Sequence, residues 1–197
     1  MTPPPTESLK DLPILPFASQ EDWRAWLADH HARAPGVWVR LYKKGSGQPT
    51  LTYAEALDEA LCYGWIDSTK NAYDAHSYLQ RFSPRKARSP WSKANRGHVA
   101  RLIEAGKMQP AGQQAIEEAK RNGQWDAAYD SPSQARMPED FLALLDRHPE
   151  AKVFFEGLDK ANRFALYYRI QSAKKPETRA RRLAWALELM LRQEKIH

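Results

Sequence analysis

The sequence predicts an α+β fold in which a small antiparallel β-sheet packs with helices and an all-helical region follows. The segments 37–42, 65–69 and 77–82 alternate with period two and are rich in β-branched and aromatic residues, which is typical of strands. Other segments between these strands repeat apolar residues at helical spacing. From Pro138 onward only the helical pattern continues, which predicts a helical C-terminal region.

The 197-residue length sits near the upper end of one typical domain. Hydrophobic residues make up 42% and charged residues 27%, within the ordinary globular range. We expect a proline-rich N-terminal arm over 1–16, an α+β core over 17–130 and a helical region over 138–197 packed on that core. The arm carries five prolines, which lack an amide donor, so we expect it to lie on the surface.

Two helices are expected in the first part of the core. The first begins after Ser19, a capping residue, and turns its tryptophans inward. The second begins after Thr52, with Glu55 at the matching position of a capping box, and ends at Gly64.

The segments 65–69 and 77–82 are separated by a polar turn, so they predict a β-hairpin. A third helix is predicted to start at Ser89-Pro90, with the serine as cap and the proline at the first helical position. A fourth is expected over 111–122. The C-terminal region is predicted to hold a short helix around 141–145, another around 153–155, a longer one over 161–170 and a last one after Pro176.

Positive charge is concentrated in two runs. Between Asp74 and Glu104 there are seven arginines and lysines and no acidic residue. From Arg169 to Arg182 there are six basic residues and one acid, a net charge of +5. The chain as a whole carries +6, so everything outside these runs carries −6. Such local basicity favours acidic partners such as phosphates, nucleic acid or an anionic surface.

The second run coincides with the start of the last predicted helix. The first amides of a helix are unpaired and its dipole is positive there, so stacked cations are unfavourable unless an anion is bound. The alternative is that Glu177 compensates and the cations point into water. We predict that the two runs converge on one concave anion site, lined by Arg81, Arg85, Trp91, Asn95, Lys174, Lys175 and Arg179.

Asp67 is the candidate acid–base residue. It lies on the first hairpin strand, just ahead of the basic run. Nearby arginines would lower the pKa of its carboxyl, so the simpler interpretation is that it pairs with and orients an arginine such as Arg81 or Arg85. Both interpretations stay open at this point.

Nucleic-acid binding is the main competing hypothesis, because the first basic run is interleaved with the rings of Tyr78, Phe82 and Trp91. No recognisable nucleic-acid-binding motif accompanies it, and Trp91 also fits a core position. Metal binding is not expected, since no HExxH or CxxC spacing occurs. No cofactor is predicted. The lone Cys62 fits the core of a helix better than a nucleophile.

The single cysteine excludes an intrachain disulfide framework and fits a reducing compartment. The N-terminal residues lack the pattern of a secretory signal, and no apolar stretch is long enough to span a membrane. We therefore expect a cytoplasmic protein.

Several consecutive stretches resemble the YdeI/OmpD-associated family of bacterial proteins, often labelled bacteriocin-protection. They are EALCYGWIDS, RFSPRKARSPWSKANRGHV, LIEAGKMQPAGQQAIEEAKRNGQW and RIQSAKKPETRARRL. The resemblance extends from about Leu12 over nearly the whole chain, with Ser68 where glycine is frequent. It implies an α+β fold with a helical C-terminal part. Its label implies a role in envelope stress or resistance to antimicrobial peptides, and it brings no reaction or cofactor.

The expected function is thus a cytoplasmic stress-resistance or bacteriocin-resistance protein with a basic anion-binding cleft and no identifiable reaction. A nucleic-acid-binding module is one alternative. The other is an enzyme acting on a phosphorylated or carboxylated small molecule, with Asp67 as its acid–base residue. The sequence does not indicate an oligomeric state.

Overall fold

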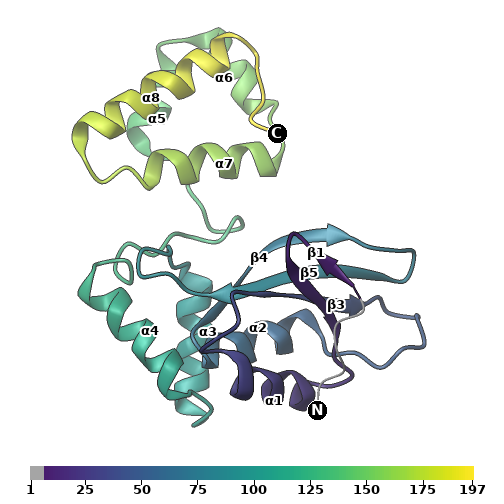
Figure 1. The fold of residues 1–197 in the computed structure, drawn as a ribbon. Coiled ribbons are helices and arrows are strands. Elements are labelled where there is room, and N and C mark those ends of the chain that lie inside the picture. The colour runs from purple at the N-terminus through teal and green to yellow at the C-terminus, as the bar shows by residue number, and fades with distance from the viewer. Residues whose placement is uncertain (1–6) are drawn as a thin grey trace. The chain divides into compact units, whose positions relative to one another are not determined.

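The computed structural model describes residues 7–197 and divides the chain into two compact units (Figure 1). The N-terminal unit contains Met1–Ser89 and Asn95–Asp126, and the C-terminal unit contains Pro90–Ala94 and Ala127–His197. Residues 1–6 of the expected proline-rich arm lie outside the described residues. Sequence reasoning did not anticipate that residues 90–94 group with the C-terminal helices.

The N-terminal unit is built on a five-stranded sheet with the order β1-β2-β3-β5-β4. Neighbouring strands are antiparallel except β2 and β3, which are parallel. The elements of this part of the chain are β1 (Ser8–Leu9), β2 (Leu12–Pro16), α1 (Gln20–His30), β3 (Val37–Tyr42), α2 (Tyr53–Cys62), β4 (Trp65–Ala72), β5 (Ser77–Pro84), α3 (Lys93–Glu104) and α4 (Pro110–Arg121). The predicted α+β class is confirmed.

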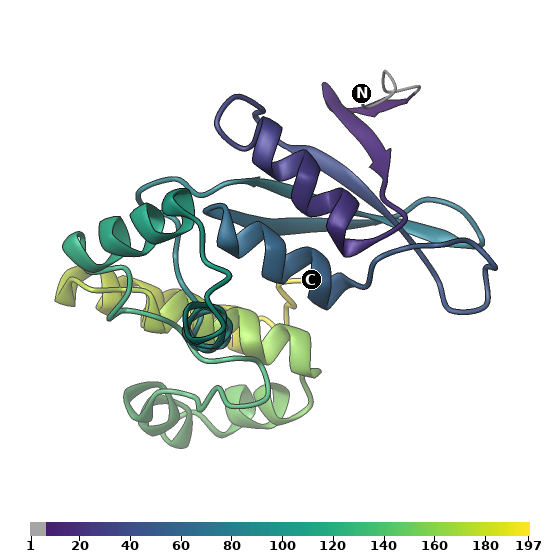
Figure 2. The ribbon, with the colours of Figure 1, turned by 90° about the horizontal axis from the view of Figure 1, so that it is seen from below.

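Helices α1 and α2 cover one face of the sheet (Figure 2). On that face the ring of Trp23 lies 5.6 Å from the ring of Phe82, and Trp26 meets Trp65 edge-on at 5.8 Å. All four rings are buried. Because aromatic side chains bury large apolar areas, these two contacts between helix and sheet are a main part of the core.

The other face of the sheet carries a smaller cluster, made by Leu12, Ile14, Trp38 and Leu79. Residues 12–16, expected within a surface arm, therefore form a strand, β2, that places two side chains in this cluster. The pairing of β2 with β3 joins residues far apart in the sequence, because Ile14 lies opposite Trp38.

The helix caps predicted from sequence are confirmed at two positions. Ser19 accepts a hydrogen bond from the amide of Asp22 at the start of α1. Thr52 and Glu55 form a reciprocal capping box at the start of α2. Each cap satisfies amides that have no partner within the helix.

The predicted helix start at Ser89-Pro90 is wrong. The Ser89 side chain accepts a hydrogen bond from the amide of Lys86 at 3.0 Å, so it closes a turn. The segment that follows is held by Tyr129: the amide of Tyr129 donates to the carbonyl of Trp91 at 3.0 Å, and the amide of Lys93 donates to the carbonyl of Tyr129 at 2.8 Å. Helix α3 begins only at Lys93.

Helices α2 and α4 approach each other closely at Gly112. A Cβ atom added there would lie 2.2 Å from the carbonyl oxygen of Cys62, so only glycine fits. The amide of Gln109 also donates to that carbonyl, at 3.1 Å. At the end of α2, Gly64 has a φ of +73° and stops the helix as expected.

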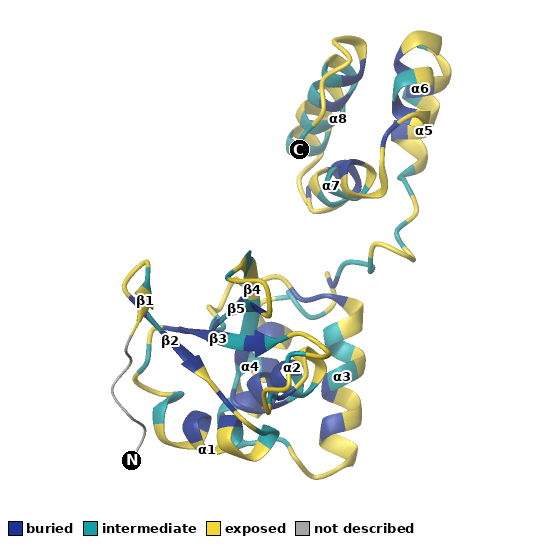
Figure 3. Cartoon of the chain, turned by 90° about the vertical axis from the view of Figure 1, so that its right-hand side faces the viewer, coloured by how far each residue is buried: buried dark blue, intermediate teal, exposed yellow. Residues whose placement is uncertain are grey.

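The C-terminal unit has its own hydrophobic core, in which α8 packs against three other helices. The rings of Phe141, in α5 (Glu139–Asp146), and Phe155, in α6 (Pro149–Glu156), meet edge-on with their centres 5.8 Å apart. Buried positions mark one side of each helix in Figure 3. The elements are α5 (Glu139–Asp146), α6 (Pro149–Glu156), α7 (Lys160–Gln171) and α8 (Pro176–Leu191).

Candidate functional site

Asp67 and Arg81, two of the site residues predicted from sequence, point to opposite faces of the sheet. Asp67 lies opposite Phe82 in the β4–β5 register, and successive residues of a strand alternate between faces. Asp67 accepts a hydrogen bond from the Tyr53 hydroxyl at 2.8 Å on the side of α2. Nε of Arg81 is buried and has no hydrogen-bond partner among the described residues. The register thus does not bring Asp67 and Arg81 together, and the alternative pairing of Asp67 with Arg85 stays a prediction.

The remaining predicted residues are divided between the units. Arg85 and Asn95 belong to the N-terminal unit and are half-buried, and the Arg85 amide donates to the Gly64 carbonyl at 2.9 Å. Trp91 belongs to the C-terminal unit and is buried. The convergence of the two basic runs on one site stays a prediction.

The predicted cations around the start of α8 have different environments. Lys174 and Lys175 are exposed, and Lys175 is the residue that precedes the helix. Arg179 instead contacts Asp140 through two of its nitrogens, at 2.6 and 2.9 Å. It also donates to the carbonyl of Ile170 at 3.4 Å. The Arg179 side chain thus connects α8 to α5 and α7.

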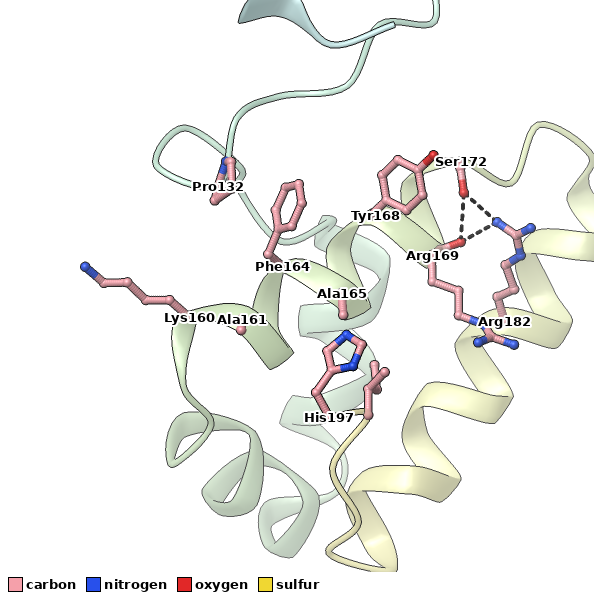
Figure 4. Close-up of a pocket in the computed structure, with 11 residues that line it drawn as sticks. Pro132, Lys160, Ala161, Phe164, Ala165, Tyr168, Arg169, Ser172, Arg182 and His197 are labelled. Atoms are coloured by element: carbon pink, nitrogen blue, oxygen red, sulfur yellow. Dashed lines mark hydrogen bonds between the residues drawn. The ribbon is translucent and has the colours of Figure 1, made fainter. Parts of the chain in front are cut away.

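A pocket of about 830 Å³ opens along one side of α7 (Figure 4). We call it the α7 pocket. Its size is within the range of small-molecule sites. Helix α7 and Ser172, which follows it, supply most of the wall, and residues from the linker, α8 and the last two positions complete it. The lining residues are Pro132, Lys160, Ala161, Phe164, Ala165, Tyr168, Arg169, Ser172, Arg182, Ile196 and His197.

One end of the α7 pocket is rich in positive charge. Arg182 donates from Nη1 to the Arg169 carbonyl and, at 2.8 Å, to the Ser172 hydroxyl (Figure 4). The guanidinium of Arg169 lies 4.1 Å from the centre of the Trp185 ring, which fixes its direction by a cation–π contact. No acidic side chain is among the residues that line the pocket. This end is therefore suited to a negatively charged group.

The rest of the α7 pocket is mainly apolar and aromatic, with Lys160 and the His197 imidazole as its polar side chains. Phe164 and Tyr168 contribute half-buried rings, and the Tyr129 ring packs edge-on against Tyr168 at 5.0 Å. Ile196 and His197 are held by Asn162, whose side-chain oxygen accepts from both amides at 2.9 and 3.1 Å. That asparagine is buried, so the wall formed by the last two residues is fixed to the interior of α7.

A polar cluster lies at a second pocket, of about 790 Å³, in the same unit. Lys93 contacts one oxygen of Asp130 at 2.6 Å, and the Tyr167 hydroxyl donates to the other at 2.8 Å. The hydrogen bond from Lys93 lowers the pKa of Asp130, whereas burial and the hydrogen bond to Asp130 raise the pKa of Tyr167. At neutral pH the aspartate stays ionised and the phenol protonated, which suits a fixed structural network better than proton transfer.

Cys62 is fully buried in the core of the N-terminal unit, and burial raises the pKa of its thiol to about 11. A protonated thiol is a poor nucleophile, in agreement with the core interpretation. Among residues 7–197, no group of three or more histidine, cysteine, aspartate or glutamate side chains could hold a metal ion. Within the same residues, no helix is both long and apolar enough to cross a membrane.

The sequence places Phe164, Ala165 and Tyr168 on a predicted helix but does not predict the α7 pocket beside it. The fully buried face of α7 is formed by Asn162, Leu166, Tyr167 and Ile170. A signal was present: Phe164, Tyr168 and Ser172 recur every four residues beside a second row formed by Ala165 and Arg169. One side of this helix therefore carries two aromatic rings followed by a hydroxyl and an arginine. The buried side of a helix is usually apolar throughout, so this combination is unusual for a core position.

Two family models match the chain. Residues 134–193 match the family described as Bacteriocin-protection, YdeI or OmpD-Associated. Residues 15–115, just over half of the chain, match the family described as Domain of unknown function (DUF8412). The chain belongs to the DUF8412 family, and its residues 134–193 match the YdeI/OmpD-associated family model. No curated protein and no solved structure matches the chain.

The predicted YdeI/OmpD-associated resemblance is thus confirmed, with a narrower extent than the quoted stretches suggest. The first two stretches lie within residues 15–115, and the third begins there but ends at residue 125. Only the last, RIQSAKKPETRARRL, falls within residues 134–193. Most residues that line the α7 pocket fall within the YdeI/OmpD-associated domain, whereas Asp67, Arg81, Arg85 and Asn95 lie in the DUF8412 domain.

Proposed function

We propose that this protein acts in bacteriocin protection by binding a small anionic molecule with an apolar body in the α7 pocket. The family label supports the protective role. The single observation that carries the binding proposal is the division of the pocket. Arg169, Ser172 and Arg182 gather at one end, and the rest is mainly aromatic and aliphatic, with Lys160 and His197 as its polar side chains. The cytoplasmic location expected from the sequence belongs to the same proposal.

This division matches the usual chemistry of small-molecule sites, where an apolar lining supplies affinity and a few polar groups fix orientation. Arg169 and Arg182 would contact the anionic group. The Ser172 hydroxyl, which donates to the Arg169 carbonyl at 3.4 Å, would have to give up that long hydrogen bond in order to donate to the anion. Phe164 and Tyr168 would pack against the apolar body. Nothing in this arrangement requires a bond in the ligand to break.

A fluorescent anion tests the proposal. Anilinonaphthalene sulfonate combines a sulfonate with an aromatic body, and its emission rises when it leaves water. We expect saturable binding that octanoate displaces. Replacing both pocket arginines (Arg169→Gln with Arg182→Gln) should weaken binding by about 10- to 100-fold, the range for hydrogen bonds to charged groups.

The control is Arg181→Gln with Arg192→Gln, which removes the same charge from exposed positions of α8 and its end. These arginines do not line the α7 pocket. The control variant should bind like the unaltered protein. Equal weakening in both double variants would indicate a nonspecific charge effect, and unchanged binding in the pocket variant would refute the proposal.

Nucleic-acid binding is a second candidate function, and one surface of the N-terminal unit favours it. Asn122 at the end of α4 donates to the Ala87 carbonyl at 2.6 Å, so the loop carrying Lys86 and Arg88 lies beside that helix end. Arg96 and Lys120 add positive charge there, with their cationic groups 5.0 and 5.5 Å from the centre of the Trp125 ring.

A titration with short single-stranded DNA and RNA at increasing salt tests this second candidate. Each phosphate contact contributes about 0.7 to the slope of log affinity against log salt for single strands. Lys86→Gln with Arg88→Gln should therefore reduce the slope by about 1.4. The same charge change at Lys43 and Lys44, in a different loop, should leave it unaltered. Absence of binding at low salt would remove this candidate.

The enzymatic alternative rests on Asp67. The Asp67 carboxylate accepts a hydrogen bond from the Tyr53 hydroxyl. The residue is half-buried, so part of it is accessible to a ligand. A bound metabolite that contacts both Asp67 and an arginine would favour this alternative, and activity that survives Asp67→Asn would oppose it.

A further inference from the structure

The α7 pocket has a smaller neighbour on the other side of Phe164. This second cavity has a volume of about 270 Å³, and we call it the annex. It is lined by Pro132, Ala135, Met137, Phe155, Lys160, Arg163, Phe164 and Tyr167. Both cavities lie entirely within the C-terminal unit.

Three residues line both cavities: Pro132, Lys160 and Phe164. The Phe164 ring therefore forms part of the wall of each, with the Pro132 ring beside it. Phe164 is half-buried, and its ring stacks on that of Tyr167 with centres 5.8 Å apart. A molecule in the α7 pocket that extends past Phe164 would enter the annex.

One wall of the annex is apolar, and the Lys160 and Arg163 side chains add charged groups to its lining. Ala135, Met137 and Phe155 contribute only hydrocarbon and thioether surface. The polar tip of Tyr167 is directed to Asp130, 2.8 Å away, so its ring face is what remains for the cavity. Arg163 donates to the Glu156 carbonyl and lies 5.4 Å over the Phe155 ring, so its charge is already engaged by these groups. A chain of methylenes fits such a lining better than a polar group does.

The charged end and the annex lie at different levels of α7. Phe164 and Ser172 are eight residues apart, which corresponds to about 12 Å along a helix. A compact anion at Arg169 and Arg182 could not reach the annex. A ligand that occupies both must therefore be elongated, with its charge at one end.

We infer that the ligand of the α7 pocket is a single-chain anionic amphiphile, with its head at Arg169 and Arg182 and its tail in the annex beyond Phe164. This inference rests on the proposed function, because it assumes that the α7 pocket binds an anion. A carboxylate and a phosphate monoester share the required head chemistry, so a fatty acid and lysophosphatidic acid are both members of this class.

The test compares octanoate with myristate, by displacement of anilinonaphthalene sulfonate and by calorimetry, at concentrations where neither forms micelles. Each methylene that leaves water should raise the affinity by up to about fourfold, so myristate should bind far more tightly. Myristate and lysophosphatidic acid carry the two kinds of head on similar chains. The ratio of their affinities shows whether the site prefers a carboxylate or a phosphate head. The inference about the tail requires that at least one of the two binds tightly.

A variant that fills the annex separates the tail from the head. Ala135→Phe should lower the affinity for myristate by at least 10-fold and leave octanoate binding unchanged. Ala143→Phe adds the same bulk at an exposed position of α5 and serves as the matched control. Thermal unfolding establishes that each variant is folded.

A second measurement needs no altered annex. In protein labelled at the methionine methyl groups, the Met137 resonance, assigned through Met137→Leu, should shift with myristate and stay in place with octanoate. Equal affinities for the two alkanoates with no Met137 shift would overturn the tail inference and leave the proposed function standing. If neither octanoate nor anilinonaphthalene sulfonate binds, the proposed function itself fails.

Discussion

Arg179 and Asp140 form a two-pronged ion pair in which Nε meets Oδ2 at 2.6 Å and Nη2 meets Oδ1 at 2.9 Å. The parallel geometry matches the planar guanidinium to the planar carboxylate, which a lysine cannot reproduce. The pair joins the first turn of α8 to the first turn of α5, two segments about forty residues apart. One of the cations predicted to bind a ligand thus has a partner within the protein.

The first prediction concerns the pH dependence of stability. The hydrogen bond from Arg179 lowers the pKa of Asp140, so the pair stabilises the folded state above the unfolded pKa of about 3.9. That contribution disappears as the pH falls through the lower folded pKa. We expect Asp140→Asn to destabilise the protein at neutral pH, with a difference from the unaltered protein that narrows below about pH 4.

Urea unfolding at a series of pH values measures this difference. Glu139→Gln changes the neighbouring exposed carboxylate and is the control. Its difference from the unaltered protein should stay small across the series. A constant difference for Asp140→Asn from neutral to acidic pH would mean that the ion pair contributes nothing.

The second prediction concerns the contact between α2 and α4. Gly112→Ala would place a methyl group against the Cys62 carbonyl, so the helices must separate. We expect a loss of about 1–3 kcal/mol in the free energy of unfolding, as for an overpacked core. Gly97→Ala is the matched control, because a Cβ at that position in α3 meets nothing within 4 Å. It should stabilise the protein by about 0.5–1 kcal/mol. The midpoints of urea unfolding would rank the stability of the two variants. Equal changes in stability would contradict the close approach of α4 to the Cys62 carbonyl.

The third prediction concerns thiol reactivity. Cys62 is fully buried, and its thiol, with a pKa of about 11, stays protonated at pH 8. Iodoacetamide should therefore label the folded protein far more slowly than the protein in concentrated urea. Mass spectrometry follows the reaction directly, since the chain has one cysteine. Rapid labelling under native conditions would show that α2 opens or that the thiol is activated.

The fourth prediction concerns the network of Lys93, Asp130 and Tyr167. Tyr167→Phe removes the hydroxyl that donates to the Asp130 carboxylate and accepts from the Asp130 amide at 3.3 Å. We expect a loss of roughly 1–3 kcal/mol, because a buried polar contact is broken. Tyr168→Phe, which alters a half-exposed ring of the α7 pocket, should cost less. A smaller loss at Tyr167 than at Tyr168 would show that the network is weak.

Elements defined by neighbouring residues were predictable from the sequence. The capping box of Thr52 and Glu55 and the stop at Gly64 involve contacts within a few residues, so their patterns suffice. The strand β2 was not predictable in this way. Its prolines indicate an irregular arm, and its place in the sheet depends on β3, which follows only after helix α1. The predicted start of α3 was wrong for a similar reason. The segment before Lys93 is held by hydrogen bonds to the backbone of Tyr129, which is distant in the sequence.

The candidate site shows the same limit. The two basic runs are visible as composition, but the sequence does not reveal which cations are already engaged. Arg179 contacts Asp140, thirty-nine residues away, whereas Arg182, three positions later, reaches the end of α7 and lines a pocket. The pocket wall also needs Ile196 and His197, whose position depends on the buried side chain of Asn162. Such long-range contacts are set by the fold.

The grouping of residues 90–94 with the C-terminal helices has a consequence for dividing the protein into fragments. The YdeI/OmpD-associated match begins at residue 134, yet Ser92 bridges Tyr129 and Lys93 pairs with Asp130. A fragment that begins at residue 134 would lack Tyr129 and Asp130. The Tyr167 hydroxyl would then lose the Asp130 carboxylate to which it donates. The C-terminal unit is discontinuous in sequence, so a fragment that keeps these contacts must contain residues 90–94 as well as 127–197.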